Sequence, residues 1–264
     1  LYTPSASSIG EKLPMIIYFY ERYSDRFHDY KTPAPSASTI NVSWFVSNGY
    51  AVFIPDIIYK VGRPGESALK CINKGVDQVL NIEKRIDPKR MGLQGQSWGG
   101  YQTAFLITRT NRYACAMAGA PVSNMFSAYG GIRYSSGMSR QFQYEKTQSR
   151  IGKTPWKGFY SYKKNSPVFY ANKVNTPFLI MHNDNDGAVP FTQGVELFMG
   201  LRRLEKPVWM LVYNGEQHNL RKRANRLDLS IRMSEFFDYY LKNSLKPDTV
   251  ISLNSIIRAG IVSQ

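Results

Sequence analysis

A serine between two glycines, Gly95-x-Ser97-x-Gly99, is the clearest chemical signal in this chain. A short apolar segment ends just before the serine, and a helical pattern of apolar residues begins just after it. A serine between a strand and a helix occupies a sharp turn, where glycines avoid the clashes that Cβ atoms would cause. The turn holds the hydroxyl above the sheet and points the first N–H groups of the helix toward its neighbourhood. The pattern therefore predicts that Ser97 is a nucleophile, rather than an incidental serine in a glycine-rich turn.

A serine hydroxyl needs a base to take its proton and a carboxylate to fix the tautomer of that base. Where a strand–turn–helix carries the serine, the carboxylate and then the histidine follow it along the chain. The chain has three histidines, and His28 precedes the serine. His182 ends an apolar strand pattern, whereas His218 lies in a polar loop between the last predicted strand and the last predicted helix. We therefore predict that His218 is the general base.

The carboxylate is expected in the loop after residues 176–182, which contains both Asp184 and Asp186. Their positions allow either one, because either side chain could turn inward. The loop lacks the further oxygen ligands and the closing glutamate of a calcium site. The two cysteines, Cys71 and Cys115, lie in apolar periodic segments and are predicted to be core residues rather than a disulfide or metal site. We predict neither a metal nor a cofactor.

The negative oxygen that forms during acyl transfer needs two hydrogen-bond donors. The backbone N–H of Trp98, directly after the serine, is the first expected donor. The second is expected from the segment that leaves the first strand. No His-Gly-Gly-Gly stands there, but Tyr20 offers a phenol in place of a backbone amide.

The composition is that of a globular protein with a large core. The chain has 264 residues, of which 43% are hydrophobic, and no apolar run is long enough to span a bilayer. The formal net charge is +15, and basic residues crowd the last third. This charge indicates an acidic partner or nucleic acid, or else a solvated helix face or a surface that meets another domain of the full protein. Because no zinc-finger spacing or RNA-binding aromatic motif accompanies it, we predict that the chain binds no nucleic acid.

Apolar runs of strand length alternate with helical patterns along the chain. Strands are predicted at 13–20, 50–54, from Met91 to Gln94, 113–120, 176–182 and 208–213, and helices at 39–47, 66–84, 97–108, 191–204 and 226–242. This alternation predicts an α/β fold, with a mainly parallel sheet and helices on both faces. Residues 121–175 break the rhythm with many Gly, Ser, Tyr and basic residues. Such a long excursion predicts a lid or substrate-pocket insertion.

Several short segments form a specific combination: Gly95-Gln96-Ser97-Trp98-Gly99-Gly100-Tyr101, Ala120-Pro121-Val122-Ser123, Ser166-Pro167, His182-Asn183-Asp184-Asn185-Asp186, Val189-Pro190 and His218. In this combination the chain resembles the catalytic domain of the prolyl oligopeptidase family of serine peptidases, in particular its dipeptidyl peptidase IV and acylaminoacyl peptidase branches. The resemblance implies an α/β-hydrolase fold. It selects Asp186, four residues after the strand-end histidine, as the triad acid, and it places the oxyanion tyrosine on Tyr20.

The resemblance also implies a pocket for the side chain that precedes the scissile bond. Candidate lining residues near Trp98 are Met125, Phe126, Tyr129 and Tyr134. An aromatic lining would favour proline or another small apolar side chain there.

Members of the family carry an N-terminal β-propeller, and this chain contains no propeller sequence. We therefore expect residues 1–264 to be a single catalytic domain that lacks one or two N-terminal edge strands of the sheet. The resemblance further favours an exported, periplasmic bacterial enzyme. The sequence leaves the oligomeric state open, a dimer included.

The leading hypothesis is a serine peptidase that hydrolyses oligopeptides through a Ser97-Asp186-His218 triad and an acyl-enzyme. A carboxylesterase or lipase would use the same triad and is the first alternative. A non-catalytic scaffold with a basic face for an acidic partner is the second. The complete set of serine, acid and histidine in the expected order argues against the scaffold.

Overall fold

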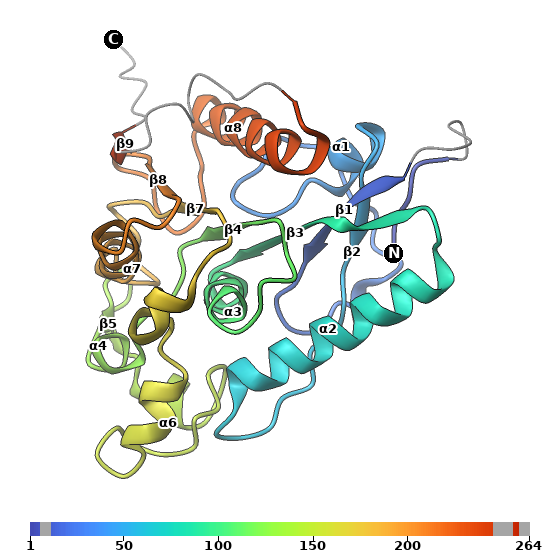
Figure 1. The fold of residues 1–264 in the computed structure, drawn as a ribbon. Helices are drawn as coiled ribbons and strands as arrows, with labels where there is room; N and C mark the ends of the chain where they lie inside the picture. Colours follow the sequence, from blue (N-terminus) through green and yellow to red (C-terminus); the bar gives the residue numbers. More distant parts are fainter. Residues whose placement is uncertain (6–11, 245–255, 259–264) are drawn as a thin grey trace.

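The structure, a computed structural model, describes residues 1–5, 12–244 and 256–258, and its centre is one parallel sheet. The described strands of this sheet lie in the spatial order β2-β1-β3-β4-β7-β8-β9 (Figure 1). Their bounds are β1 Leu13–Tyr18, β2 Ala51–Phe53, β3 Ile86–Gln96, β4 Cys115–Gly119, β7 Phe178–Met181, β8 Val208–Val212 and β9 Ile256–Arg258. Each neighbouring pair of these strands runs parallel. The predicted α/β fold with a mainly parallel sheet is thus confirmed.

Helices cover both faces of the sheet, as parallel strands with crossover connections require. One face carries α1 and α8, and the other carries α2, α3 and α7 (Figure 1). Their bounds are α1 Val42–Ser47, α2 Pro64–Ile82, α3 Trp98–Ile107, α7 Thr192–Arg203 and α8 Arg223–Lys242. The α3 helix is buried along its whole length, which explains why its sequence is apolar nearly all round.

Two hydrophobic cores form because successive strand side chains point to opposite faces of the sheet. Along β1, Met15 and Ile17 enter the core under α2, α3 and α7, whereas Ile16 enters the core under α1 and α8. All three side chains are fully buried. The run of apolar residues that predicted this strand therefore reflects burial on both faces.

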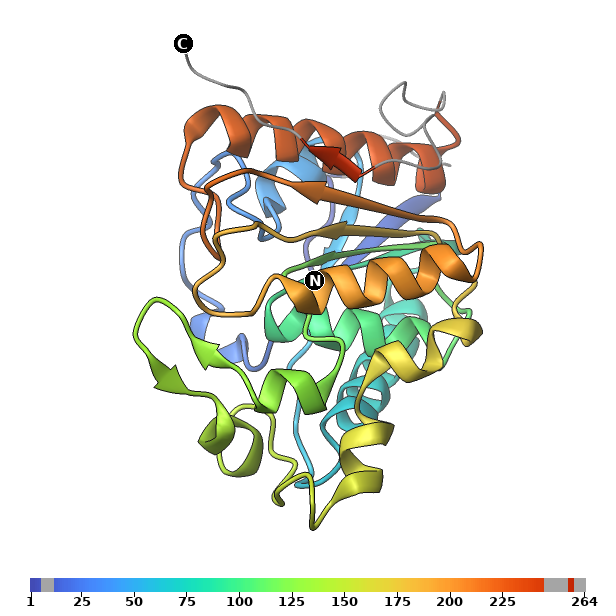
Figure 2. The same ribbon diagram turned by 90° about the vertical axis from the view of Figure 1, so that its left-hand side faces the viewer.

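The segment 121–175 forms short elements on the side of the sheet away from α8 (Figure 2). These elements are α4 Met125–Tyr129, β5 Ile132–Arg133, β6 Met138–Ser139, α5 Gln141–Glu145, α6 Phe159–Lys164 and the 3₁₀ segment η2 Pro167–Lys173. A further 3₁₀ turn, η1, covers Ser24–Arg26. The β5–β6 pair is a small antiparallel ribbon separate from the main sheet.

Several element boundaries differ from the predictions by a few residues, and two of the differences have a clear local cause. The first helix begins at Val42 rather than near residue 39, because the side chain of Asn41 accepts a hydrogen bond from Trp44 N and caps it. β3 already begins at Ile86, so the Asp87-Pro88 pair lies inside a strand, where the register with β1 is irregular and tolerates a proline. Residues 256–258, which had no predicted structure, add the edge strand β9 beside β8.

The two cysteines are free thiols, and only one is a core residue. Cys115 is fully buried in β4, and burial raises the pKa of its thiol. Cys71 on α2 is only partly buried, which corrects the prediction for this residue. Among the helices that the structure describes, none combines the length and the apolar character needed to cross a bilayer.

Candidate active site

Ser97 lies in a strained turn between β3 and α3. Its φ of 61° is in the left-handed region, and its backbone N–H donates to Gly119 O at 2.7 Å. A Cβ on Gly95 would lie 2.3 Å from Gly99 O, and a Cβ on Gly99 would lie 2.4 Å from Phe19 O. Each of these contacts is with backbone, which cannot easily move aside. The two glycines therefore permit the close crossing that exposes the serine, as their spacing predicted.

Trp98 contributes a backbone donor and a packing side chain to this turn. Its N–H is the first of α3 and has no partner inside the helix. Its indole is buried, donates to Tyr59 Oη at 3.0 Å and stacks on Tyr101 at 4.3 Å between ring centroids. The ring thus fixes the residue while the N–H stays available beside Ser97.

The loops after β7 and β8 bring an aspartate and a histidine together. Because the strands are parallel, these loops leave the same edge of the sheet as the turn at Ser97. His218 Nδ1 lies 2.7 Å from Asp186 Oδ2. A carboxylate only accepts, so Nδ1 carries the proton of the neutral imidazole and Nε2 keeps its lone pair. His218 and Ser97 line the same cavity, which has a volume of about 180 Å³.

Asp186 is held in place from several sides. Its side chain is fully buried, and Oδ1 accepts the backbone N–H groups of Ala188 and Val189 at 2.8 and 2.9 Å. His182 Nε2 lies 3.3 Å from Oδ2, so this carboxylate contacts two imidazoles. Burial by itself would raise the pKa of Asp186, but the hydrogen bonds from His182 and His218 outweigh it and hold the pKa well below its usual value. The group is therefore a carboxylate at neutral pH.

Asp184 takes a different position. Its Oδ1 accepts the backbone N–H of Gly215 at 2.8 Å, on an exposed part of the loop. This bond ties the loop after β7 to the loop after β8. Of the two aspartates that the loop offers, only Asp186 is hydrogen-bonded to His218.

Tyr20, two residues beyond the end of β1, places its phenol beside the serine. Its hydroxyl accepts a hydrogen bond from Gln148 Nε2 at 2.6 Å, and Tyr20 and Ser97 line the same cavity. Burial raises the pKa of Tyr20 above its usual value of about 10, so the phenol is protonated at neutral pH. The role of second oxyanion donor stays a prediction for this residue.

A chain of side-chain amides ends on this phenol and sets the direction of its proton. Arg133 Nη2 donates to Gln143 Oε1 at 3.2 Å, Gln143 Nε2 to Gln148 Oε1 at 2.5 Å, and Gln148 Nε2 to Tyr20 Oη at 2.6 Å. Because arginine can only donate, Gln143 turns its oxygen toward Arg133 and its nitrogen toward Gln148. Gln148 in turn accepts with its oxygen and donates with its nitrogen. Tyr20 Oη is therefore an acceptor within the chain, and its own proton is free to point toward the cavity. We call these four residues the relay.

None of the four predicted pocket residues is among the residues that line the cavity beside Ser97. Met125 is fully buried in the core, and Phe126 packs within a cluster of aromatic rings. Tyr129 is buried and donates to Glu145 at 2.7 Å, whereas Tyr134 is 67% exposed. The described aromatic residues that line this cavity are Tyr20 and Trp98. The preference for proline stays a prediction. Phe126 and Tyr129 instead pack against other aromatic residues of the segment 121–175.

Polar residues of the segment 121–175 line the cavity instead. The described lining residues are Tyr20, Ser97, Trp98, Val122, Arg133, Arg140, Gln143, Gln148, Ala188, Val189 and His218. The sequence analysis missed two arginines and two glutamines. Their only signal in the sequence was the polar, basic character of an insertion already assigned to the substrate pocket.

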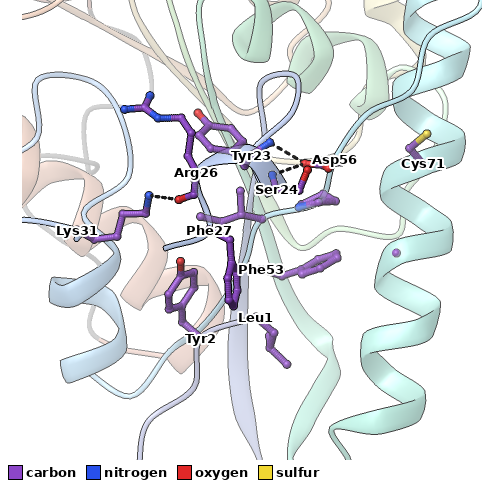
Figure 3. A pocket seen from close by; sticks show the side chains of 13 residues that line it. Leu1, Tyr2, Tyr23, Ser24, Arg26, Phe27, Lys31, Phe53, Asp56 and Cys71 are labelled. Carbon is purple, nitrogen blue, oxygen red and sulfur yellow. Dashed lines mark hydrogen bonds between the residues drawn. The ribbon is translucent and has the colours of Figure 1, made fainter. Parts of the chain in front are cut away.

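A larger cavity, of about 420 Å³, lies near the start of the chain and shares no lining residue with the cavity at Ser97. Figure 3 shows it between residues 1–2, η1, the end of β2 and α2. Asp56 there accepts the backbone N–H groups of Tyr23 and Ser24 at 2.6 and 3.0 Å. Ser97 and His218 line the smaller cavity and not this one. Within the described residues, no cluster of His, Cys, Asp and Glu side chains has the makings of a metal site.

The chain is similar in sequence to known proteins. A family model described as "Prolyl oligopeptidase family" matches residues 61–244. The chain is 26% identical over 226 residues to "Uncharacterized peptidase YuxL" of Bacillus subtilis, covering 81% of this chain and 32% of that protein. It is 30% identical over 161 residues to the acylamino-acid-releasing enzyme of Rattus norvegicus, covering 60% of this chain and 21% of that protein.

Solved structures show the same fold. The acylaminoacyl peptidase of Pyrococcus horikoshii matches with a TM-score of 0.76 and 22% identity, covering 95% of this chain and 40% of that chain. The chain thus spans well under half the length of the relatives that it matches.

Proposed function

Because the chain belongs to the prolyl oligopeptidase family of serine peptidases, we propose that it carries the catalytic machinery of a peptidase that hydrolyses oligopeptides. The observation that supports this most is the 2.7 Å hydrogen bond between His218 and Asp186, with His218 and Ser97 lining one cavity. That combination meets the requirement of acyl transfer for a nucleophile, a base and an orienting carboxylate.

Each residue has one role in the proposed reaction. Ser97 Oγ attacks the carbonyl carbon of the scissile bond while His218 Nε2 takes the hydroxyl proton. Asp186 holds the imidazole in the required tautomer and stabilises its positive charge. The amide C–N bond then breaks, and His218 returns the proton to the leaving amine. A water molecule, activated by the same imidazole, hydrolyses the acyl-enzyme and regenerates the serine.

Two donors stabilise the negative oxygen of the tetrahedral intermediate. One is the N–H of Trp98, and the other is the hydroxyl of Tyr20. The relay supports this second role, because Gln148 donates to the phenol and leaves the phenol proton for the substrate oxygen.

The chain is proposed to be one catalytic domain of a longer protein, with residues 121–175 forming part of the substrate pocket. The matched relatives are longer than this chain. We attribute the additional length to a further domain, a β-propeller that restricts access to short peptides.

Labelling with a fluorophosphonate tests the nucleophile directly. The wild-type protein should be labelled at Ser97, and Ser97→Ala should lose both the label and hydrolysis of acetyl-dipeptide coumarylamides. The expected loss in kcat is on the order of 10⁴- to 10⁶-fold. Undiminished labelling of the variant would refute the assignment. Hydrolysis of acyl esters without any hydrolysis of the amides would favour an esterase.

A further inference from the structure

Two guanidinium groups line the cavity beside the proposed nucleophile. Arg133 belongs to β5, and Arg140 directly precedes α5. None of the described lining residues is acidic. The cavity therefore presents a concentration of positive charge beside Ser97 and His218.

Arg140 is a buried cation with neutral partners. Its side chain is 1% exposed. Nη1 donates to Ala188 O, Nη2 donates to Tyr144 Oη at 3.2 Å, and no described atom pairs with Nε. A charge removed from water is stable only when an opposite charge or a full set of hydrogen bonds compensates for the lost hydration. Arg140 thus has a missing counter-charge and an unused donor.

Arg133 is half-buried, and among the described residues its side chain donates to Gln143 Oε1, which is also a neutral group. The described ion pairs include neither arginine. Carboxylates of neighbouring elements are already engaged. Glu21 forms two hydrogen bonds with Arg150 at 3.1 Å, and Glu145 accepts from Tyr129.

We propose that Arg133 and Arg140 bind a carboxylate of the substrate next to the scissile bond. This inference rests on the proposed peptidase function and adds the substrate class. A planar guanidinium binds a carboxylate through paired N–H donors. Neither an amide nor an apolar side chain of the substrate can take the place of the carboxylate in this pairing. The carboxylate is either that of an Asp or Glu side chain or the free C-terminus of the peptide.

Two pairs of substrates for the full-length protein distinguish these sources. The first pair is the coumarylamides of acetyl-Ala-Glu and acetyl-Ala-Gln, which differ only in the side-chain charge. The second pair is acetyl-tetra-alanine with a free or an amidated C-terminus. We expect the charged member of one pair to have a kcat/KM about tenfold to hundredfold higher, as a charge-assisted hydrogen bond permits. Ratios below about twofold in both pairs would overturn the proposal.

Variants assign the preference to the two arginines. Arg133→Gln and Arg140→Gln should each reduce the preferred ratio toward one. Arg203→Gln, a matched loss of one positive charge at an exposed position of α7 outside the cavity lining, should leave the ratio unchanged. An unchanged ratio in Arg133→Gln would refute its role, even if Arg140→Gln does not fold.

Binding to the inactive Ser97→Ala protein separates this inference from the proposed function. Calorimetry should show tighter binding of the charged member of the preferred substrate pair, whether or not the wild type turns it over. If the wild type shows turnover and Ser97 labelling but both members bind with equal affinity, the carboxylate site is refuted and the peptidase function stands. If the charged member binds more tightly but there is neither turnover nor labelling, the carboxylate site stands and the peptidase function is refuted.

Discussion

The hydroxyl of Tyr20 should contribute more to the rate when Gln148 orients it as a donor. Tyr20→Phe removes one of two proposed oxyanion donors and keeps the ring that packs against the core. Loss of one such donor costs about 10²- to 10³-fold in kcat. Because this hydrogen bond forms with the developing oxyanion, KM should change little.

Gln148→Met removes the 2.6 Å hydrogen bond that orients the phenol and keeps a side chain of similar length. A neutral hydrogen bond contributes about 0.5–1.5 kcal/mol, so we expect kcat to fall by about threefold to tenfold. Gln141→Met is a matched control, because Gln141 is exposed on α5 and lies outside the relay.

The combined variant decides whether the two residues act together. If Gln148 works only through the phenol, adding Gln148→Met to Tyr20→Phe should change kcat by less than about twofold. Steady-state kinetics on one coumarylamide substrate gives kcat for the wild type, the two single variants and the double variant. Circular dichroism checks that each of them is folded. If the reduction in kcat of the double variant equals the product of the two single reductions, Gln148 does not act through the relay.

Further predictions concern the carboxylate and the turn. Asp186→Asn should lower kcat by about 10⁴-fold, because His218 loses the required tautomer. The kcat of Asp184→Asn should stay within about tenfold of the wild-type value, and steady-state kinetics of both variants measures the difference. Folding lowers the pKa of Asp186, so the carboxylate stabilises the fold fully above its unfolded-state pKa of about 3.9, and this stabilisation declines as the pH falls below that value. In urea titrations, the difference in the free energy of unfolding between wild type and Asp186→Asn should therefore become smaller from about pH 6 to about pH 3. Gly99→Ala should lower the free energy of unfolding by about 1–3 kcal/mol, because the new Cβ would meet backbone. Gly200→Ala on α7, where a Cβ meets nothing within 4 Å, should raise it by about 0.5–1 kcal/mol.

The residues proposed for the reaction could be predicted because their signals are local. The glycines around Ser97 report a close backbone crossing, and that crossing exists only where a strand turns directly into a helix. The order of serine, acid and histidine follows from the parallel sheet, whose loops leave one edge in sequence. Between Asp184 and Asp186, however, residue spacing alone gave no choice. The choice between the two depends on which carboxylate turns toward the imidazole of His218.

The pocket could not be predicted because tertiary packing assembles it. Arg133, Gln143 and Gln148 come from a small ribbon, a one-turn helix and the loop after it. None of these elements has a periodic pattern that fixes which side chains point inward. The aromatic residues of the same segment looked equally suited to a pocket, but Tyr129 became buried against its neighbours. The edge strand β9 was missed for a similar reason, since three residues are too short for a periodic signal.

The one-way orientation of the relay makes the site vulnerable to slow chemical ageing of a single amide. Deamidation of Gln148 yields glutamate, which replaces the donating nitrogen with a second acceptor oxygen. Gln143 could still donate to that carboxylate, but Tyr20 would then turn its own proton toward it and away from the substrate. Mass spectrometry of aged protein, paired with the Gln148→Glu variant, should reveal an enzyme that keeps its fold and its fluorophosphonate label while turnover falls by about the same factor as in Tyr20→Phe.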